Sequence, residues 1–337
     1  MARTVRFHEL GGPDVMRLED VDPGEPGPGE VRLRVEAIGV NRAEALFRSG
    51  HYIEPVKRFP ARLGNEAAGV IEAIGPDVTG FEPGQRVSVV PNFSQNDYGV
   101  YAEAAIVPVT SLVPRPEPVD AVSGAAVWMP YLTAYGAMAE VARMRAGDVA
   151  VIDAASSSVG LAAIHTADRL GARPFAVTRT RAKARQLAEE GAAEVIVSEE
   201  EDVTARVLEL TGGKGAEYVF DAVAGPGVVD LARAVAPGGT LFLWGALSGR
   251  PTPYPGFDLG MPALNMRTYT MLEIAKDPER LRRAVAFITS GLRAGAFRPV
   301  VDRVFPLERI VQAHRHMESN TQFGKIVVTT AQRGARP

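Results

Sequence analysis

The second half of the chain alternates short apolar runs with helix-forming stretches, and this alternation constrains the fold more than any other feature. Strands are expected at residues 149–154, 174–178, 194–197, 217–222 and 240–244. Helices are expected between them, and Gly171 and Gly191 close the first two. Such a strand–helix–strand series folds as a parallel sheet with helices on both faces. The pattern therefore predicts an α/β, doubly wound, parallel-sheet domain that binds its ligand beyond the carboxyl ends of the strands.

The first part of the chain follows a different pattern, rich in strands and in Pro/Gly turns. Strands are expected at residues 4–7, 31–40, 68–74 and 86–90, with one short helix at 42–48. Closely spaced strands without long helices predict a small barrel or a partly open sheet. The last stretch holds expected helices at 278–292 and 307–317 and a strand at 325–329. A chain of 337 residues with this change of pattern is expected to form about two domains.

Composition argues against several classes of protein. The formal net charge is only −3 and no basic tract stands out, so no nucleic-acid partner is expected. The chain has no cysteine, which excludes disulfides, thiolate nucleophiles and cysteine-based zinc sites. The first residues run straight into a strand pattern, and no stretch approaches the ~20 apolar residues of a membrane helix. A soluble cytoplasmic protein without a membrane partner is expected.

The strand at 149–154 leads into Ala-Ala-Ser-Ser-Ser-Val-Gly at residues 154–160 and then into a helix. A strand, a tight turn and a helix present backbone N–H groups and the positive end of the helix dipole to a pyrophosphate. Glycines normally allow that close approach, but here only Gly160 remains and serines precede it. Residues 157–160 are interpreted as a dinucleotide cradle, and the alternative is a plain serine-rich N-cap. The surrounding βαβ series favours the nucleotide.

The second strand of that series ends at Thr178 and is followed by Arg-Thr-Arg-Ala-Lys at residues 179–183. Enzymes that prefer NAD place an acid here for the ribose hydroxyls. Arginine and lysine instead pair with a 2′-phosphate, which an acid would repel. Because no acid stands at this place, the segment favours NADP(H) over NAD(H). The alternative is that these cations belong to a solvated helix start.

Four motifs follow one another along nearly the whole chain. They are Gly-Val-Asn-Arg-Ala-Glu at 39–44, Gly-Asn-Glu-Ala-Ala-Gly-Val-Ile-Glu-Ala-Ile-Gly at 64–75, Leu-Thr-Ala-Tyr-Gly at 132–136 and Gly-Lys-Ile-Val-Val at 324–328. Together they resemble the medium-chain dehydrogenase/reductase superfamily, in its zinc-free quinone oxidoreductase or zeta-crystallin-like branch. The resemblance implies a GroES-like β domain at residues 1–122, completed by about 290–337, and a Rossmann NADP(H)-binding domain at 123–289. It also implies an active site in the cleft between these domains and a homodimer through edge strands, for which the strand near 267–272 is a candidate.

The resemblance also bears on metal binding and on the reaction. Zinc-dependent members of the superfamily bind zinc through two cysteines and a histidine, and the corresponding positions here hold Asn41, Asn65 and Met129. These residues do not form a zinc ligand set, so no metal is expected. The resemblance then implies an NADPH-dependent reductase that transfers hydride to a quinone or to an α,β-unsaturated carbonyl compound. The alternatives are an enoyl-thioester reductase and a nucleotide-binding protein with lost or minor activity.

The resemblance assigns roles to individual residues. Tyr52 resembles the family's tyrosine near the nicotinamide and substrate, where a phenol stabilises developing oxyanion charge, and the alternative is an aromatic that packs a loop. Asn41 resembles the asparagine near the reactive end of the cofactor, and its alternative is a helix N-cap. The other expected cofactor contacts are Thr133 at the nicotinamide, Ser157, Ser158, Val159 and Gly160 at the pyrophosphate, Thr178, Arg179 and Lys183 at the adenosine ribose and its phosphate, Val223 at the adenosine, and Gly245 and Ala246 at the nicotinamide ribose. The helical histidines His165, His314 and His316 are expected at the surface or at an interface.

Overall fold

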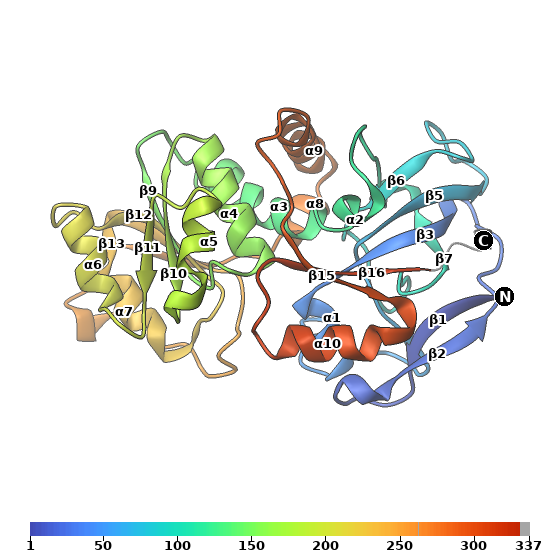
Figure 1. Cartoon of the computed structure of the whole chain (residues 1–337), viewed down its shortest axis with the longest axis horizontal. Coiled ribbons are helices and arrows are strands. Elements are labelled where there is room, and N and C mark those ends of the chain that lie inside the picture. The colour runs from blue at the N-terminus through green and yellow to red at the C-terminus, as the bar shows by residue number, and fades with distance from the viewer. Residues whose placement is uncertain (262, 331–337) are drawn as a thin grey trace. The chain divides into compact units, whose positions relative to one another are not determined.

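The computed structural model of the chain describes residues 1–261 and 263–330 (Figure 1). The chain divides into two compact units, one formed by Met1–Met129 with Pro299–Pro337 and the other by Pro130–Arg298. Each unit has a hydrophobic core of its own. Within the described ranges, no helix combines the length and the apolar character that crossing a bilayer requires.

The first unit is built from two sheets. A three-stranded sheet has the order β2 (Met16–Val21), β1 (Ala2–Phe7), β4 (Ala61–Arg62). A seven-stranded sheet has the order β15 (Val301–Pro306), β16 (Lys325–Thr329), β3 (Glu30–Val40), β5 (Ala67–Ile74), β6 (Arg86–Val89), β8 (Leu112–Pro114), and β7 (Ala104–Pro108) also pairs with β3. Along most of β3 buried and partly buried side chains alternate, as expected for a strand with one face on a core. The strand-rich first part is confirmed.

The C-terminal segment returns to the first unit. After β15, helix α10 (Ile310–Glu318) leads to β16, which pairs antiparallel with β3, with Ile326 opposite Val40 and Val328 opposite Ile38. The same helix contacts both β15 and β16 (Figure 1). This pairing sets the start of β16, at Lys325, beside the end of β3 and the start of α1 (Arg42–Arg48).

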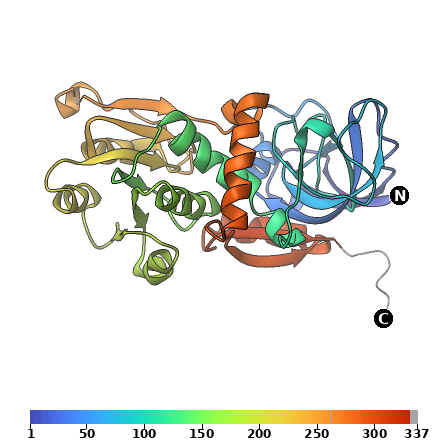
Figure 2. The same ribbon diagram turned by 90° about the horizontal axis from the view of Figure 1, so that it is seen from above.

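The second unit holds a six-stranded sheet whose neighbouring strands are all parallel. Its order is β11 (Glu194–Val197), β10 (Arg173–Thr178), β9 (Val149–Ile152), β12 (Ala216–Asp221), β13 (Val235–Leu243), β14 (Asn265–Thr268). Numbered along the chain this is the order 3-2-1-4-5-6 of dinucleotide-binding folds. Helix α4 (Ser158–Arg169) packs on β9 and β10 and α7 (Val228–Arg233) packs on β12 and β13 (Figure 2). The expected α/β fold with a Rossmann parallel sheet is confirmed, and its switch point lies between β9 and β12.

Local sequence explains where these elements begin. All four residues of β9 are buried, which is typical of a parallel strand covered on both faces. Helix α9 (Pro278–Arg293) follows Asp277, whose carboxylate accepts the N–H groups of Glu279 and Arg280, and Pro278 stands at its first position. The remaining helices are α2 (Ala121–Gly124), α3 (Trp128–Tyr135), α5 (Ala184–Glu189), α6 (Val203–Leu210) and α8 (Leu272–Ala275).

Three expected strand boundaries are wrong. The strand expected at 149–154 ends at Ile152, because Ala154 adopts φ +49°, outside the strand region. The strand expected at 240–244 already begins at Val235, because the Pro-Gly-Gly at 237–239 is a bulge inside β13 and not a turn. The strand expected near 267–272 is β14 at Asn265–Thr268, and residue 272 begins α8.

The histidine prediction is also wrong for two of the three residues. The exposed fraction is 6% for His165 and 0% for His314. Hydrogen bonds make this burial tolerable. The Tyr131 hydroxyl lies 2.8 Å from His165 Nδ1, and the Tyr101 hydroxyl lies 3.2 Å from His314 Nε2. Burial also lowers the pKa of His314 to about 3, so its ring is neutral.

Candidate functional site

The turn between β9 and α4 lies at the switch point of the parallel sheet. Helix α4 begins after Ser157, whose Oγ accepts a hydrogen bond from the Gly160 N–H at 3.0 Å. A side chain at Gly160 would clash, because its Cβ would lie 2.5 Å from the Ala155 carbonyl oxygen. Residues 157–160, all four expected in the cradle, are thus held in the first turn of a long helix. The N–H groups and the dipole of such a turn favour an anion.

Two cations stand close to this turn in sequence or in space. Lys183 Nζ donates a hydrogen bond to Ser156 Oγ at 3.1 Å, which brings the lysine to the serine turn. Thr178 is the last residue of β10 and is buried, and Arg179 follows it on the surface. The guanidinium of Arg179 has no hydrogen-bond or ion-pair partner among the described residues, whereas Arg181 is held by Glu200. Contact of Arg179 and Lys183 with a cofactor phosphate stays a prediction.

The loops after β12 and β13 are joined to each other. The N–H groups of Leu247 and Ser248 donate to the carbonyl oxygens of Ala222 and Val223 at 3.1 and 2.9 Å. Gly245 permits this approach, because a Cβ there would lie 2.5 Å from the Ala222 carbonyl oxygen. The expected contacts Val223, Gly245 and Ala246 thus lie together at the carboxyl ends of β12 and β13. Thr133 lies on α3, is 5% exposed and stays a predicted contact.

Two acids flank the switch point. Asp153 directly follows β9, and Asp221 ends β12, the strand that pairs with β9. Asp221 also accepts the N–H groups of Val223 and Ala224. Burial, and then the charge of Asp221, raise the pKa of Asp153 to about 7, because two buried carboxyls side by side cannot both ionise easily. The pair therefore holds a proton near neutral pH.

In the first unit, a buried glutamate joins the two asparagines singled out from the sequence. Glu44 Oε2 accepts the N–H of Asn41 at 2.8 Å, and Glu44 Oε1 accepts the N–H of Asn65 at 3.3 Å. The side chain of Glu44 is fully buried. Burial is the largest cause that raises the pKa of Glu44 to about 7. One carboxyl group thus sets the end of β3 next to the segment before β5.

A second buried glutamate, Glu66, binds both the backbone of Met129, the third position that corresponds to a zinc ligand, and the side chain of Lys325. Glu66 Oε1 accepts the N–H of Met129 at 2.9 Å, and Glu66 Oε2 lies 2.6 Å from Lys325 Nζ. Lys325 Nζ also donates to Asn41 Oδ1, while Asn41 Nδ2 faces Gly39 O at 3.2 Å and Glu66 Oε2 at 3.3 Å. Lys325 and Glu66 are 1% and 0% exposed, so this is a fully buried ion pair. Both polar ends of the Asn41 side chain are bound within it.

Tyr52 lies in the loop after α1. Its ring packs edge-on against Phe47, with ring centroids 6.3 Å apart, so the packing alternative holds for the ring. Burial, followed by the charges of Glu44 and Glu54, raises the pKa of Tyr52 to about 12. The phenol is therefore a neutral donor at physiological pH. A role for Tyr52 in the reaction stays a prediction, as does a cofactor contact for Asn41.

Comparison with known proteins decides the family. Residues 27–117 match the alcohol dehydrogenase GroES-like domain, and residues 190–328 match the zinc-binding dehydrogenase domain. The chain is 33% identical over 332 residues to a quinone oxidoreductase of Pseudomonas aeruginosa, with 97% of this chain and 99% of that protein covered. The chain belongs to the quinone oxidoreductase family.

Two further relatives of this quinone oxidoreductase family member have names that state a substrate or a cofactor. A 2-haloacrylate reductase of a Burkholderia species is 30% identical, with 97% of this chain and 99% of that protein covered. The crystal structure of Escherichia coli quinone oxidoreductase complexed with NADPH gives a TM-score of 0.90 at 26% identity, covering 98% of this chain and 100% of that one. The chain is thus an oxidoreductase of the medium-chain dehydrogenase/reductase superfamily, as the motifs indicated.

The matching domain family is described as zinc-binding, so we ask whether the residues of this quinone oxidoreductase family member could bind zinc. The three positions that correspond to zinc ligands hold two amides and a thioether, which are poor zinc ligands. The ammonium of Lys325 binds Glu66 and Asn41, so a cation of the protein's own already neutralises the carboxylate there. No three His, Asp or Glu side chains gather as a metal site anywhere in the described residues. The residues present do not fit zinc.

Sequence reasoning missed the residues that organise these sites. Glu44 and Lys325 lie within the motifs at 39–44 and 324–328, and Asp153 and Asp221 lie within two expected strands, but no sequence pattern assigned a role of its own to any of the four. A signal existed for the acids, because both stand at the carboxyl ends of the two strands that flank the switch point: Asp153 directly follows β9, and Asp221 is the last residue of β12. A lysine opening the apolar strand Lys-Ile-Val-Val-Thr is a weaker signal for a buried ion pair.

Proposed function

We propose that the chain is an NADPH-dependent reductase that transfers hydride, without zinc, to a quinone or an α,β-unsaturated carbonyl compound. The observation that carries this proposal is the buried Lys325 ammonium, bound to Glu66 and Asn41 where zinc-dependent relatives are expected to hold their metal. Without a Lewis acid, the oxidation of an alcohol lacks its main source of activation, whereas an acceptor that is already electron-poor needs none. The Escherichia coli relative crystallised with NADPH and the 2-haloacrylate reductase support the cofactor and the class of acceptor.

The bound cofactor supplies the hydride, and the protein supplies position and electrostatics. The first turn of α4 would hold the pyrophosphate, and Arg179 and Lys183 would pair with the 2′-phosphate. When hydride adds to the electron-poor carbon of the acceptor, the displaced electron pair ends on the carbonyl oxygen. The neutral phenol of Tyr52 is a donor for that oxygen, and a proton from solvent or from the protein completes the product.

The reaction is tested by following NADPH oxidation with a panel of quinones, enones, enoyl thioesters and 2-haloacrylate. We expect turnover of quinones or enones, no stoichiometric zinc in the purified protein and no loss of rate with a chelator. Turnover of enoyl thioesters alone would make the protein an enoyl-thioester reductase. Cofactor binding without any turnover would make it a nucleotide-binding protein, and a chelator-sensitive rate would overturn the metal-free mechanism.

The choice of NADPH is tested with two arginines that lie close together. Arg179→Ala is expected to weaken NADPH binding by about 10-fold or more, because it removes a charge-assisted contact, and to leave NADH binding unchanged. Arg181→Ala is the matched control, since Arg181 is also exposed but already paired with Glu200. Equal affinities of the wild type for NADPH and NADH would contradict the assignment of Arg179.

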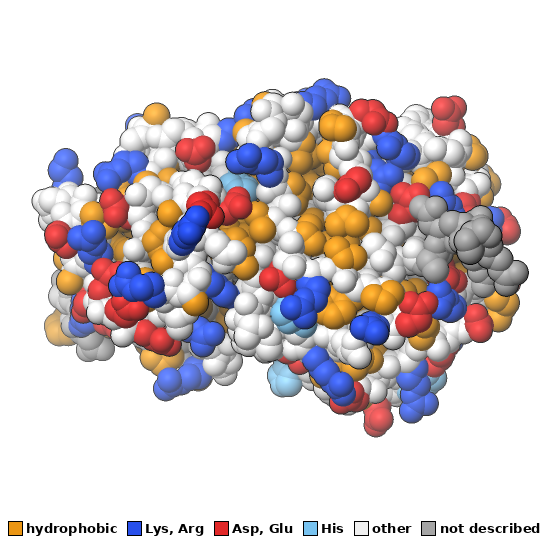
Figure 3. Space-filling view, viewed as in Figure 1, with side chains coloured by type: hydrophobic (Ala, Val, Ile, Leu, Met, Phe, Trp, Pro, Cys, Tyr) orange, Lys and Arg blue, Asp and Glu red, His pale blue; other side chains and the backbone are white. Residues whose placement is uncertain are grey.

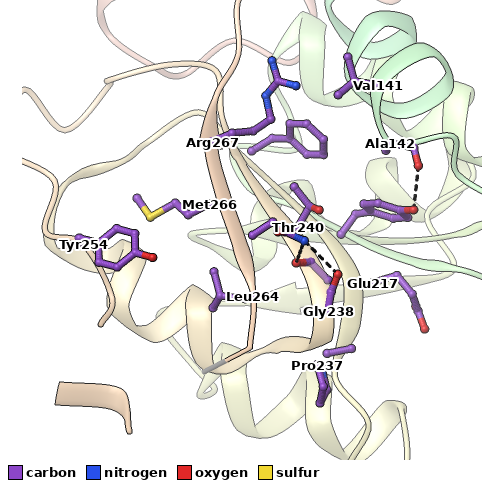
Figure 4. Close-up of a pocket in the computed structure, with 15 residues that line it drawn as sticks. Val141, Ala142, Glu217, Pro237, Gly238, Thr240, Tyr254, Leu264, Met266 and Arg267 are labelled. Atoms are coloured by element: carbon purple, nitrogen blue, oxygen red, sulfur yellow. Dashed lines mark hydrogen bonds between the residues drawn. The ribbon is translucent and has the colours of Figure 1, made fainter. Parts of the chain in front are cut away.

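We also propose that the protein is a homodimer that pairs through β14. This strand is an edge, because β13 is its single partner among the described strands. The segment before β14 exposes three large apolar side chains: Tyr254 is 76%, Phe257 87% and Met261 70% exposed. Single exposed apolar side chains are common on protein surfaces, but several in one segment are typical of a surface that contacts another protein. A hollow of about 720 Å³ is lined by residues of β13 and β14, among them Thr240 and Met266, and by Tyr254 of the segment between the two strands (Figure 4).

Light scattering tests the dimer. Phe257→Asp is expected to give monomers, whereas Leu10→Asp, at an apolar residue of the first unit that is 50% exposed, leaves the mass unchanged. A monomeric wild type would remove the proposal.

A further inference from the structure

Asn65 is a buried asparagine whose side chain has no partner in the protein. The residue is 5% exposed, and its Oδ1 is buried without a hydrogen bond. Its Nδ2 also has no acceptor among the described residues, although it is not fully enclosed as Oδ1 is, so either orientation of the amide leaves a polar end unpaired. A buried polar atom without a partner costs about 1–3 kcal/mol and calls for an explanation such as a ligand.

The neighbouring asparagine, Asn41, differs from Asn65, because its side-chain amide has hydrogen-bond partners. The Asn41 side chain is bound at both ends, by Lys325 on Oδ1 and by Gly39 and Glu66 on Nδ2. The two asparagines lie close together, because one carboxyl group, that of Glu44, accepts both of their backbone N–H groups. Of the two amides that stand where zinc ligands are expected, only that of Asn65 is therefore uncommitted.

The backbone around Asn65 is fixed although its side chain is not. Leu63 and Glu66 are fully buried, and Gly64 N donates to Gln95 Oε1 at 3.0 Å. Gly64 has φ +102°, and a Cβ there would lie 2.3 Å from the ring of Tyr101. A hydrogen-bond donor on such a rigid segment is already in place, so little reorganisation is needed when charge develops on an oxygen beside it.

We infer that Asn65 is a substrate-binding residue whose Nδ2 donates a hydrogen bond to the carbonyl oxygen of the acceptor, together with the hydroxyl of Tyr52. This inference rests on the proposed function and names the contact that the acceptor makes. Tyr52 is the donor that the proposed function gives to the same oxygen. The charge of Glu44, whose carboxyl group accepts the backbone N–H of Asn65, is one of the causes that raise the pKa of Tyr52. The contact strengthens as hydride adds to the electron-poor carbon and the displaced electron pair moves onto the oxygen.

The experiment compares three variants with the wild type. Asn65→Leu removes both polar ends at similar volume. Asn65→Asp replaces the N–H donor by an oxygen, which repels the developing charge when ionised and donates when protonated. Asn92→Leu is the matched control, because Asn92 Oδ1 is also buried without a partner while its Nδ2 binds Thr110 O at 3.0 Å. For each protein, kcat and KM for a naphthoquinone such as menadione, the Kd for NADPH and the urea midpoint are measured.

We expect Asn65→Leu to lower kcat/KM by about 10²-fold, with the NADPH Kd and the urea midpoint unchanged, since the loss of one oxyanion donor has this size. Asn92→Leu is expected to keep the wild-type rate. Asn65→Asp is expected to be slow at pH 8 and to regain rate as the pH falls and its carboxyl group becomes a donor, which a purely structural role would not produce. A wild-type rate in Asn65→Leu, or equal losses in Asn65→Leu and Asn92→Leu, overturns the inference.

Binding separates this inference from the proposed function. Menadione binding is measured by quenching of tryptophan fluorescence in the presence of NADP⁺, where no hydride is available. If the wild type binds menadione but turns over no acceptor, the proposed function fails, and a binding loss in Asn65→Leu still supports the contact. If Asn65→Leu binds as tightly as the wild type, the contact is wrong. If the wild type neither binds nor reduces any carbonyl compound, both proposals fall.

Discussion

At the scale of single residues, the buried charges of the first unit are arranged around the two asparagines. A buried charge is tolerated only when it is paired and hydrogen-bonded, and Lys325 and Glu66 meet that condition with each other. Both asparagines lie in sequence motifs, and both stand at positions that correspond to zinc ligands in the zinc-dependent members of the superfamily. Nothing local in the sequence connects either asparagine with Lys325, which lies near the other end of the chain.

The ion pair makes a prediction for stability. Lys325→Met keeps the apolar stem but removes the ammonium, leaving the Glu66 carboxylate buried without its cation. We expect the free energy of unfolding in urea to fall by about 3–5 kcal/mol. The double variant Lys325→Met with Glu66→Gln is expected to recover much of this loss. Losses that simply add would show that the two side chains do not act as a pair.

Tyr52 makes a prediction for catalysis. Tyr52→Phe removes the hydroxyl and keeps the ring that packs on Phe47. We expect kcat for a quinone to fall by about 10- to 10²-fold because an oxyanion donor is lost, with little change in NADPH affinity. Because the pKa of Tyr52 is about 12, its own ionisation adds no inflection to the wild-type rate near neutral pH. An unchanged rate, measured at saturating NADPH, would remove Tyr52 from the reaction.

At the scale of elements, β9 and β12 lie side by side although β10 and β11 separate them in the sequence. Apolar runs predicted both strands, and the βαβ rule predicted that they are parallel. The pairing that brings Asp153 to Asp221 depends on strand order, which the runs do not encode. The serine turn is the opposite case, because strand, turn and helix are contiguous and were predicted from residues 149–170 alone.

The acid pair makes a prediction for pH dependence. The pKa of Asp153 rises from its ordinary 3.8 to about 7 on folding, so the folded protein binds this proton more tightly than the unfolded chain. That contribution to stability is complete below about pH 4 and is lost as the pH rises to about 7. Asp153→Asn stays neutral at every pH. Its gain in free energy of unfolding over the wild type is expected to grow between pH 5 and pH 8, by an amount on the order of 2 kcal/mol. A difference that is independent of pH, by urea unfolding, would contradict the raised pKa.

At the scale of the whole molecule, two units with separate cores carry the chemistry. Acidic and basic side chains are interspersed over the face seen in Figure 3, as the small net charge indicates. This described face presents no continuous basic track of the kind that follows a nucleic-acid backbone.

The two tryptophans allow the units to be followed separately, because Trp128 belongs to the first unit and Trp244 to the second. NADPH at 100 times its Kd is expected to stabilise the unit that holds the serine turn by about 2.7 kcal/mol. In urea, a Trp128→Phe variant, in which Trp244 reports, should show this shift. A Trp244→Phe variant should show a smaller one. Equal shifts would show that the two units unfold as one cooperative body.

The sequence by itself determined the elements and the fold class. Hydrophobic periodicity, caps and turn residues act between neighbours along the chain, so β9, α4 and β16 could be predicted from their own residues. Only the tertiary structure decided which buried polar side chains form hydrogen bonds with one another and which remain without a partner. Glu44 joins Asn41 to Asn65, Lys325 occupies the carboxylate of Glu66, and the amide of Asn65 is left unpartnered. These pairings depend on long-range packing, in which a buried polar atom must find its partner wherever the fold brings one, and no local pattern encodes that choice.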